Sequence, residues 1–226
     1  SGNGIPDILD EARYELEWMF KMIVDEKDPY YGDEAGLVYH SVSNNFYMPL
    51  GMKPSEYQIA GGARIVEPPT VSAAFDVAAC AAQASRLWKG IDDDFADLCL
   101  EKAKLCYEAA IKGGNSTAFS DISAEYYEDA DTSDELYWAA CELFAATGEQ
   151  TYRNEIMKSK YAFKVPASVT NQEIDACLPS TGENVNIAVS REESVPFSYT
   201  GTAAFGTLSL ILSDKISEND KMMIPI

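Results

Sequence analysis

Apolar residues recur at three- and four-residue spacing along much of the chain, which is the period of an amphipathic helix. The first such stretch follows Pro6, which suits the first turn of a helix, and Asp7, whose negative charge is favourable there. Its apolar positions are Ile8, Leu9, Ala12, Leu16, Met19, Phe20 and Ile23. The pattern predicts a first helix of about five turns.

Two further helices are predicted before residue 113. Residues 70–88, with Thr70 as the N-cap, carry Ala and other small residues on nearly every face. Small side chains allow close packing on several sides, so we expect this helix to be central. Asp92 caps a third helix that runs to about Lys112. The apolar stripe of this third helix comprises Phe95, Leu98, Cys99, Leu105, Cys106 and Ala109.

The C-terminal half predicts three more helices. Thr132 and Glu135 have the spacing of a capping box, which starts a fourth helix that ends at Thr147-Gly148. Residues 149–160 and 200–212 are the fifth and the sixth. Successive helices with almost no strand pattern predict an all-α architecture of helical hairpins. The pattern does not distinguish a bundle, a solenoid and a toroid, although the absence of a fixed repeat period argues against a regular solenoid.

Long loops separate some of these helices. Residues 25–69 are rich in Gly, Pro, Tyr and Asn, and Leu37–Val42 is the one short strand that we predict within them. Residues 165–196 form a second long loop, and a shorter one rich in Tyr and Asp precedes Thr132. Loops of such length in a compact domain are often functional.

The charge of the chain restricts its partners. Lys and Arg number 17 against 37 Asp and Glu, a formal net charge of −20. Nucleic acid and anionic membrane surfaces would repel such a field, so we expect neither as a partner. A neutral polysaccharide is compatible with it, and so are cations, while solubility alone would also account for it. No apolar run reaches the length of a membrane span, and no apolar leader opens the chain.

The five cysteines do not indicate a metal site or a disulfide scaffold. Cys80, Cys99, Cys106 and Cys141 lie in apolar, helix-periodic stretches, where cysteine behaves as a small buried hydrophobe. There is no C-x-x-C pair and a single histidine, which argues against a Cys/His zinc site.

Aromatic residues concentrate in two of the loops. The first holds His40, Phe46, Tyr47 and Tyr57, and the second holds Phe119, Tyr126 and Tyr127. Sugar rings present flat C–H faces, so aromatic platforms beside hydrogen-bonding groups are what an oligosaccharide groove requires. The alternative is that these rings cover hydrophobic surface beneath the loops.

Acidic and hydroxyl side chains gather at residues 129–135, immediately before the fourth helix. Such oxygen ligands suit a hard cation such as calcium, but acidic residues are also favoured at helix N-termini. Paired carboxylates for glycosidic chemistry cannot be chosen from 37 acids by pattern alone.

Several segments together resemble glycoside hydrolase family 9. The most specific is Ser1-Gly2-Asn3-Gly4-Ile5-Pro6-Asp7-Ile8-Leu9-Asp10-Glu11-Ala12, which with Glu15–Met19 looks like the family's signature helix almost residue for residue. Val38–Val42 is similar to the family's Val-Tyr-His-Lys-Val segment. The further segments are Pro69–Trp88, Ser133–Leu143 with Thr147-Gly148, and Phe205–Leu210.

The resemblance implies an (α/α)6 toroid that hydrolyses β-1,4-glucan with inversion, one carboxylate activating water while a carboxylic acid protonates the leaving oxygen. In the family the base lies in an Asp-Ala-Gly-Asp motif upstream of the signature helix, and the acid lies near the C-terminus. This sequence has neither segment. We therefore expect residues 1–226 to be an internal part of one catalytic domain, without the catalytic carboxylates.

The resemblance also implies particular site residues. His40 matches the upstream loop histidine, Phe46 and Tyr47 fall where the family places aromatic subsite residues, and Tyr126, taken with Tyr127, matches a cleft tyrosine.

A structural calcium ion is implied at the start of the fourth helix. Asp134 and Glu135 match calcium ligands, and Asp131 adds its carbonyl or carboxylate. Members with this site often supply a further acid where this chain has Tyr199–Thr202, and the lack of it weakens the calcium site.

The leading hypothesis is thus the scaffold and part of the cleft of a secreted β-glucan hydrolase. Its rival is a non-catalytic glycan-binding or structural module on the same helices. An unrelated α-toroid enzyme would require a metal or acid cluster that the sequence does not show. Helix faces left uncovered in a partial toroid predict self-association.

Overall fold

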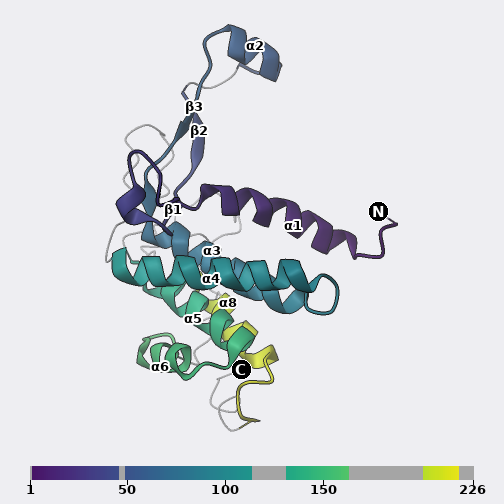
Figure 1. Cartoon of the computed structure of the whole chain (residues 1–226), viewed down its shortest axis with the longest axis vertical. Coiled ribbons are helices and arrows are strands. Elements are labelled where there is room, and N and C mark those ends of the chain that lie inside the picture. Colours follow the sequence, from purple (N-terminus) through teal and green to yellow (C-terminus); the bar gives the residue numbers. More distant parts are fainter. Residues whose placement is uncertain (1, 46–48, 114–130, 163–200, 219–226) are drawn as a thin grey trace, which may run out of the picture.

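The computed structural model describes residues 2–45, 49–113, 131–162 and 201–218, and most of these residues are helical (Figure 1). The α-helices are α1 (Asp7–Met19), α2 (Pro54–Ile59), α3 (Val71–Leu87), α4 (Asp93–Gly113), α5 (Ser133–Thr147), α6 (Gln150–Lys158) and α8 (Ala203–Leu212). Two 3-10 helices span Phe20–Met22 and Gly32–Glu34, and the strands are β1 (Val38–Tyr39), β2 (Val42–Asn44), β3 (Arg64–Val66) and β4 (Pro69–Thr70). Each of the six helices predicted from the sequence is present.

Helices α3, α5 and α8 lie side by side, with α4 packed against α3 and α6 against α5 (Figure 1). The helices α3 and α4 form an antiparallel hairpin through a short turn, and Asp92 Oδ1 caps α4 by accepting a 3.0 Å hydrogen bond from the Phe95 N–H. Thr70 caps α3, its Oγ1 accepting from the Ala73 N–H at 3.3 Å. Both caps agree with the sequence pattern.

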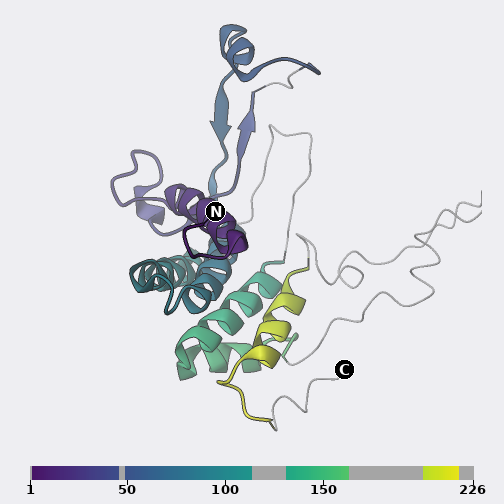
Figure 2. The ribbon, with the colours of Figure 1, turned by 90° about the vertical axis from the view of Figure 1, so that its right-hand side faces the viewer.

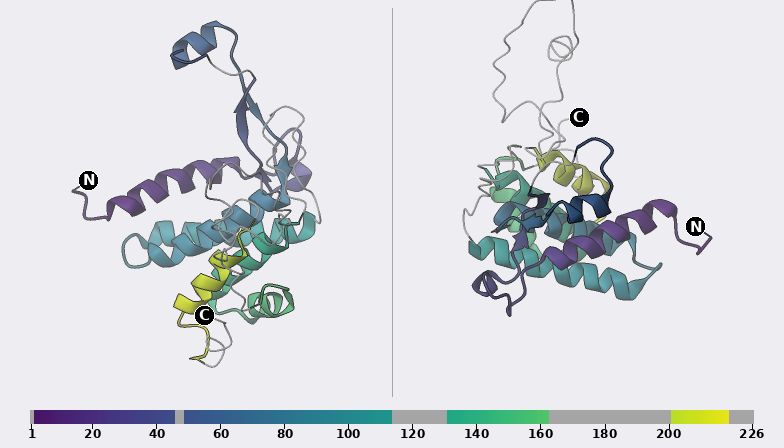
Figure 3. Two further views of the ribbon diagram at one scale, coloured as in Figure 1. Left: turned by 180° about the vertical axis from the view of Figure 1, so that it is seen from behind. Right: turned by 90° about the horizontal axis from the view of Figure 1, so that it is seen from above.

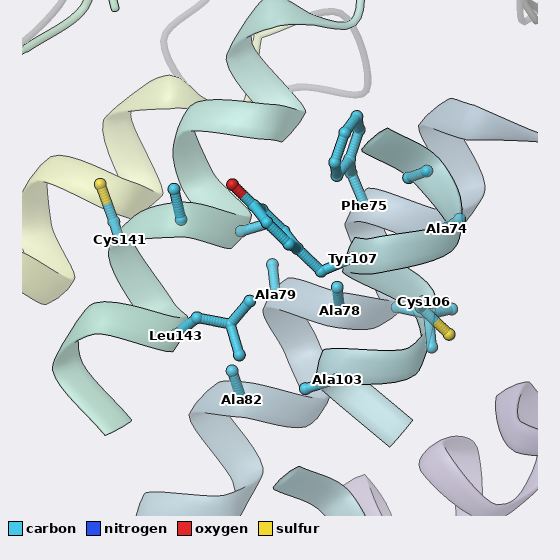
Figure 4. Close-up of a cluster of buried hydrophobic side chains, with 14 of the residues drawn as sticks. Ala74, Phe75, Ala78, Ala79, Ala82, Ala103, Cys106, Tyr107, Cys141 and Leu143 are labelled. Atoms are coloured by element: carbon cyan, nitrogen blue, oxygen red, sulfur yellow. The ribbon is translucent and has the colours of Figure 1, made fainter. Parts of the chain in front are cut away.

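Small residues bring these helices close together. Figure 4 shows Ala78, Ala79 and Ala82 of α3 among side chains of the neighbouring helices, and all three are completely buried. In α8, a Cβ placed on Gly206 would lie 3.0 Å from the Trp138 Cα, so only glycine allows α8 to approach α5 this closely. The prediction that residues 70–88 form a central helix is confirmed.

Cysteine and apolar positions match the predictions in part. Cys99, Cys106 and Cys141 are buried and Cys80 is half-buried, and all four are free thiols. Burial raises the pKa of the Cys80, Cys99 and Cys106 thiols to about 12, so these groups are inert hydrophobes. The buried face of α4 is narrower than the apolar stripe predicted for the third helix, because Leu98 and Leu105 are exposed.

Arg13 attaches α1 to the turn between α3 and α4. Its Nη1 donates to Asp92 Oδ2 at 2.9 Å, and its guanidinium carbon lies 4.2 Å from the centroid of the Phe95 ring and 5.4 Å from that of Trp88. Arg13 therefore joins an ion pair to cation–π contacts with two buried rings. In Figure 3, α1 crosses the α3–α4 hairpin on one side.

A two-stranded ribbon rises from the start of α3 and projects from the helices, with α2 at its tip (Figures 1 and 2). Strand β1 pairs with β4 and β2 with β3, both antiparallel. The His40 N–H donates to the Pro68 O at 3.1 Å and the Glu67 N–H to the Ser41 O at 2.9 Å, in the same register. Residues 38–44 and 64–70 thus form one continuous antiparallel ribbon, where the sequence predicted a single strand.

Within the described residues, no helix has both the length and the apolar content needed to cross a membrane.

Candidate functional site

The N-terminal ends of α5 and α8 lie together. Asp134 Oδ2, in the first turn of α5, accepts hydrogen bonds from the Thr202 N–H at 2.8 Å and the Thr202 hydroxyl at 3.2 Å, and Thr202 is the N-cap of α8. Further along, Ser209 of α8 donates to Glu142 of α5, so the two helices run in the same direction. Gln83, in the second half of α3, also donates to Glu142, in the second half of α5, and Figure 1 shows both helices running from left to right. The N-termini of all three helices therefore face one side.

His40 lies on the ribbon at this side of the molecule. Its Nδ1 is 3.2 Å from the Oγ1 of Thr70, the N-cap of α3, and its ring is half-buried. Burial lowers the pKa of His40 below the ordinary value of 6.5, and the charge of Glu67 opposes that shift without cancelling it. His40 is therefore neutral at pH 7. The structure places this predicted sugar-contacting residue at the helix ends.

Glu67 is a site residue that sequence reasoning missed. It is 5% exposed, and its Oε1 accepts no hydrogen bond within the described residues. Its backbone lies opposite Ser41, next to His40. A single glutamate before Pro68 carries no signal in the sequence, because its burial depends on the strand pairing.

Only some of the aromatic residues in the two predicted sugar-binding loops lie in the part of the chain that the structure describes. Tyr57, on α2, is buried and donates from its hydroxyl to Asn45 Oδ1 at 2.7 Å, so it holds the tip of the ribbon together rather than offering a sugar platform. Phe46, Tyr47, Tyr126 and Tyr127 lie outside the described residues, and their contact with sugar stays a prediction.

The start of α5 is organised differently from the predicted capping box. Thr132 is the N-cap residue, but its side chain accepts no capping hydrogen bond. Asp131 Oδ1 accepts from the Ser133 N–H at 3.0 Å instead, and both Asp134 and Glu135 are buried. The capping-box prediction is therefore wrong, because the carboxylates of α5 turn toward α8 and the core.

Two of the three proposed calcium ligands, Asp131 and Asp134, accept hydrogen bonds from other residues. Asp131 Oδ2 accepts from Lys160 Nζ at 2.7 Å, and Asp134 Oδ2 accepts two donors from Thr202. Burial alone would raise the pKa of Asp131, but the hydrogen bonds from Lys160 and Ser133 outweigh burial and lower it.

Calcium requires about six to eight oxygen ligands. The part of the chain that is described contains no group of three or more His, Cys, Asp or Glu side chains placed to hold a metal. Donors from Lys160 and Thr202 occupy oxygens of Asp131 and Asp134 that calcium would need. Calcium binding stays a prediction, and chelation tests it.

A second polar cluster, also absent from the predictions, lies inside the helices. Glu142 of α5 is 0% exposed and accepts hydrogen bonds from Gln83 at 3.2 Å, from Trp138 Nε1 at 3.4 Å, and from Arg86 and Ser209. Its donors come from α3, α5 and α8, so this carboxylate joins the three central helices. A glutamate within the apolar run of residues 139–145 was the signal that could have revealed it.

Comparison with known proteins places the chain among glycoside hydrolases. The family model described as Glycosyl hydrolase family 9 matches residues 2–201. The cellulose 1,4-beta-cellobiosidase of Acetivibrio thermocellus is 41% identical over 179 residues, which are 74% of this chain and 19% of that protein. Endoglucanase C of Cellulomonas fimi is 37% identical over 161 residues, 70% of this chain and 14% of that protein. The chain thus spans less than a fifth of the length of both relatives.

A solved structure shares the arrangement of the helices. The Bacteroides ovatus GH9 structure matches 99% of this chain and 36% of its own, with a TM-score of 0.68 and 26% sequence identity.

Proposed function

Because the chain belongs to glycosyl hydrolase family 9, we propose that it forms part of the cleft wall of an enzyme that cleaves β-1,4-glucan with inversion. Its fold is all-α, a part of an (α/α)6 toroid. The two curated relatives described above act on cellulose or are endoglucanases by name, which supports a β-1,4-linked glucan as the substrate class.

The observation that carries this proposal is the position of His40 beside Thr70, the N-cap of the central helix α3. The ribbon fixes the backbone of His40, whose N–H donates to the Pro68 carbonyl, and the His40 Nδ1 lies 3.2 Å from Thr70 Oγ1. A neutral, half-buried imidazole held at two points is a suitable group for binding a sugar hydroxyl, because little conformational entropy is lost on binding.

We assign to this chain substrate binding rather than proton transfer. Inverting hydrolysis requires a carboxylate base and a carboxylic acid on opposite faces of the scissile bond. The 226 residues contain no Asp-Ala-Gly-Asp motif of the kind that supplies the base. We therefore propose that both catalytic carboxylates belong to other parts of the polypeptide, and that these residues alone do not turn over substrate.

Binding and hydrolysis are tested separately. Titration of the 226-residue protein with cellohexaose by calorimetry should show binding that His40→Ala weakens by about tenfold, the effect of one lost hydrogen bond. Tyr14→Ala, which removes an exposed aromatic ring from α1, should bind like the unaltered protein. Equal binding by His40→Ala and the unaltered protein would refute the role of His40.

Reducing-sugar release from soluble cellulose derivatives should be absent for these 226 residues. Measurable release would overturn the assignment of the catalytic carboxylates to other segments. Binding without release, in a parent polypeptide that lacks both catalytic motifs, would instead establish the non-catalytic glycan-binding module.

Two further expectations complete the proposal. A polysaccharide cannot cross a membrane, so we place the protein outside the cell, which fractionation of the producing culture would test. Self-association is expected through the exposed apolar residues of α8, namely Phe205, Leu208 and Leu212. Sedimentation equilibrium at two concentrations would reveal it, and a monomer at both would refute it.

A further inference from the structure

Thr70 is the meeting point of three hydrogen-bonding groups. Its Oγ1 lies 3.3 Å from the Ala73 N–H, for which it is the N-cap acceptor, 3.3 Å from Ser72 Oγ and 3.2 Å from His40 Nδ1. Thr70 is 1% exposed and Ser72 is 7% exposed, which leaves water little access to the two hydroxyls. The directions of the hydrogen bonds must therefore be settled among these four residues.

A hydroxyl has one hydrogen and two lone pairs. The Ala73 N–H can only donate, so it takes one lone pair of Thr70 Oγ1. Two arrangements of the remaining groups are then possible. In the first, Ser72 donates to Thr70 and Thr70 donates to His40 Nδ1. In the second, His40 donates from Nδ1 to Thr70, and Thr70 donates to Ser72.

Only the first arrangement gives every buried hydrogen an acceptor. In the second, the Ser72 hydroxyl hydrogen has no acceptor among the described residues, and leaving a buried donor without an acceptor is costly. The helix dipole favours the same choice, because the lone pair of Nδ1 then points toward the positive N-terminal end of α3.

We infer that Thr70 is a positioning residue that fixes neutral His40 as the tautomer with its proton on Nε2. Nε2 has no partner among the described residues, so the imidazole offers an N–H donor there. The ligand that such a donor takes is an uncharged oxygen, a hydroxyl or ring oxygen of a β-glucan. This identification of the ligand rests on the proposed function, whereas the tautomer does not.

The chain has a single histidine, so nitrogen-15 NMR reports on one ring without assignment by mutation. In the sugar-free protein at neutral pH, the protonated and unprotonated ring nitrogens give well separated signals. The inference predicts that Nε2 carries the proton. A spectrum with the proton on Nδ1 would overturn it, and that result requires no variant to fold.

Variants then connect the tautomer to Thr70. Thr70→Ser keeps the hydroxyl and should keep the Nε2–H tautomer, whereas Thr70→Val removes the hydroxyl and should give a mixture of both tautomers. Ser72→Ala is the matched control: it removes a neighbouring hydroxyl, the Thr70 hydrogen then has only His40 Nδ1 as acceptor, and the Nε2–H tautomer should persist. A Thr70→Val spectrum identical to that of the unaltered protein would refute the role of Thr70.

Calorimetry with cellohexaose separates this inference from the proposed function. Thr70→Val should weaken binding about threefold to tenfold, and Thr70→Ser should restore it. If the unaltered protein shows the Nε2–H tautomer but no binding, the proposed function fails and the tautomer assignment stands. If it binds with the proton on Nδ1, the tautomer assignment fails and the proposed function stands.

Discussion

Replacing Glu142 by Ala should lower the stability of the protein more than replacing any exposed acid. Glu142 is 0% exposed and accepts hydrogen bonds from Ser209 on α8 and from Arg86 on α3. Without the carboxylate, the buried Ser209 hydroxyl loses its acceptor, which costs about 1–2 kcal/mol. Arg86 loses its charge partner, and since its side chain is 28% exposed it recovers water, which limits that loss to about 1–2 kcal/mol.

The two losses together amount to about 3 kcal/mol of unfolding free energy. For a chain of this size, about 1 kcal/mol lowers the melting temperature by about 2–4 °C, so the expected decrease is about 6–12 °C. Circular dichroism during heating measures the decrease, and urea unfolding gives the free energy from the midpoint if the slope is unchanged.

Glu149→Ala is the matched control. Glu149 also forms an ion pair, in this case with Lys104 Nζ at 2.6 Å, but its side chain is 47% exposed. Such surface pairs contribute about 0–1 kcal/mol. If Glu142→Ala is no more destabilising than Glu149→Ala, the three central helices are not held together by Glu142 and the argument is wrong.

Three further predictions concern the same helices. Gly206→Ala should cost about 1–3 kcal/mol in urea unfolding, since its Cβ would meet the Trp138 Cα at 3.0 Å, and a neutral effect would contradict the close approach of α8. Gly148→Ala should cost about 1 kcal/mol by the same measurement, because this residue ends α5 at φ +73°, where a Cβ would make only ordinary contact with Lys215 Cδ at 3.7 Å but a side chain is strained. An unchanged midpoint would refute that strain. If calcium binds at Asp131, Asp134 and Glu135, a chelator should lower the melting temperature and added calcium should restore it; an unchanged melting temperature would remove the calcium site.

The helices could be predicted because their signals are local. Thr70 and Asp92 cap the helices that they precede, and Gly148 ends α5, so each boundary depends on residues within one turn. Apolar periodicity then gave the extent of each helix to within a few residues. The central position of α3 followed from its composition, since only close neighbours on several sides explain so many small residues.

The predictions that failed depend on contacts between distant residues. The ribbon pairs residues 38–44 with 64–70, and nothing in either segment alone specifies that pairing. Glu67 and Glu142 became buried for the same reason, since their surroundings come from other elements.

The continuous register of the ribbon has a consequence for variation among related chains. His40 is held by the pairing of residues 38–44 with 64–70, while the segment between these strands packs on itself through Tyr57 and Asn45. The tip can therefore change in length or sequence without moving the imidazole. The ribbon behaves as a modular insertion, in which the outer end is free to diverge while the inner end keeps its geometry.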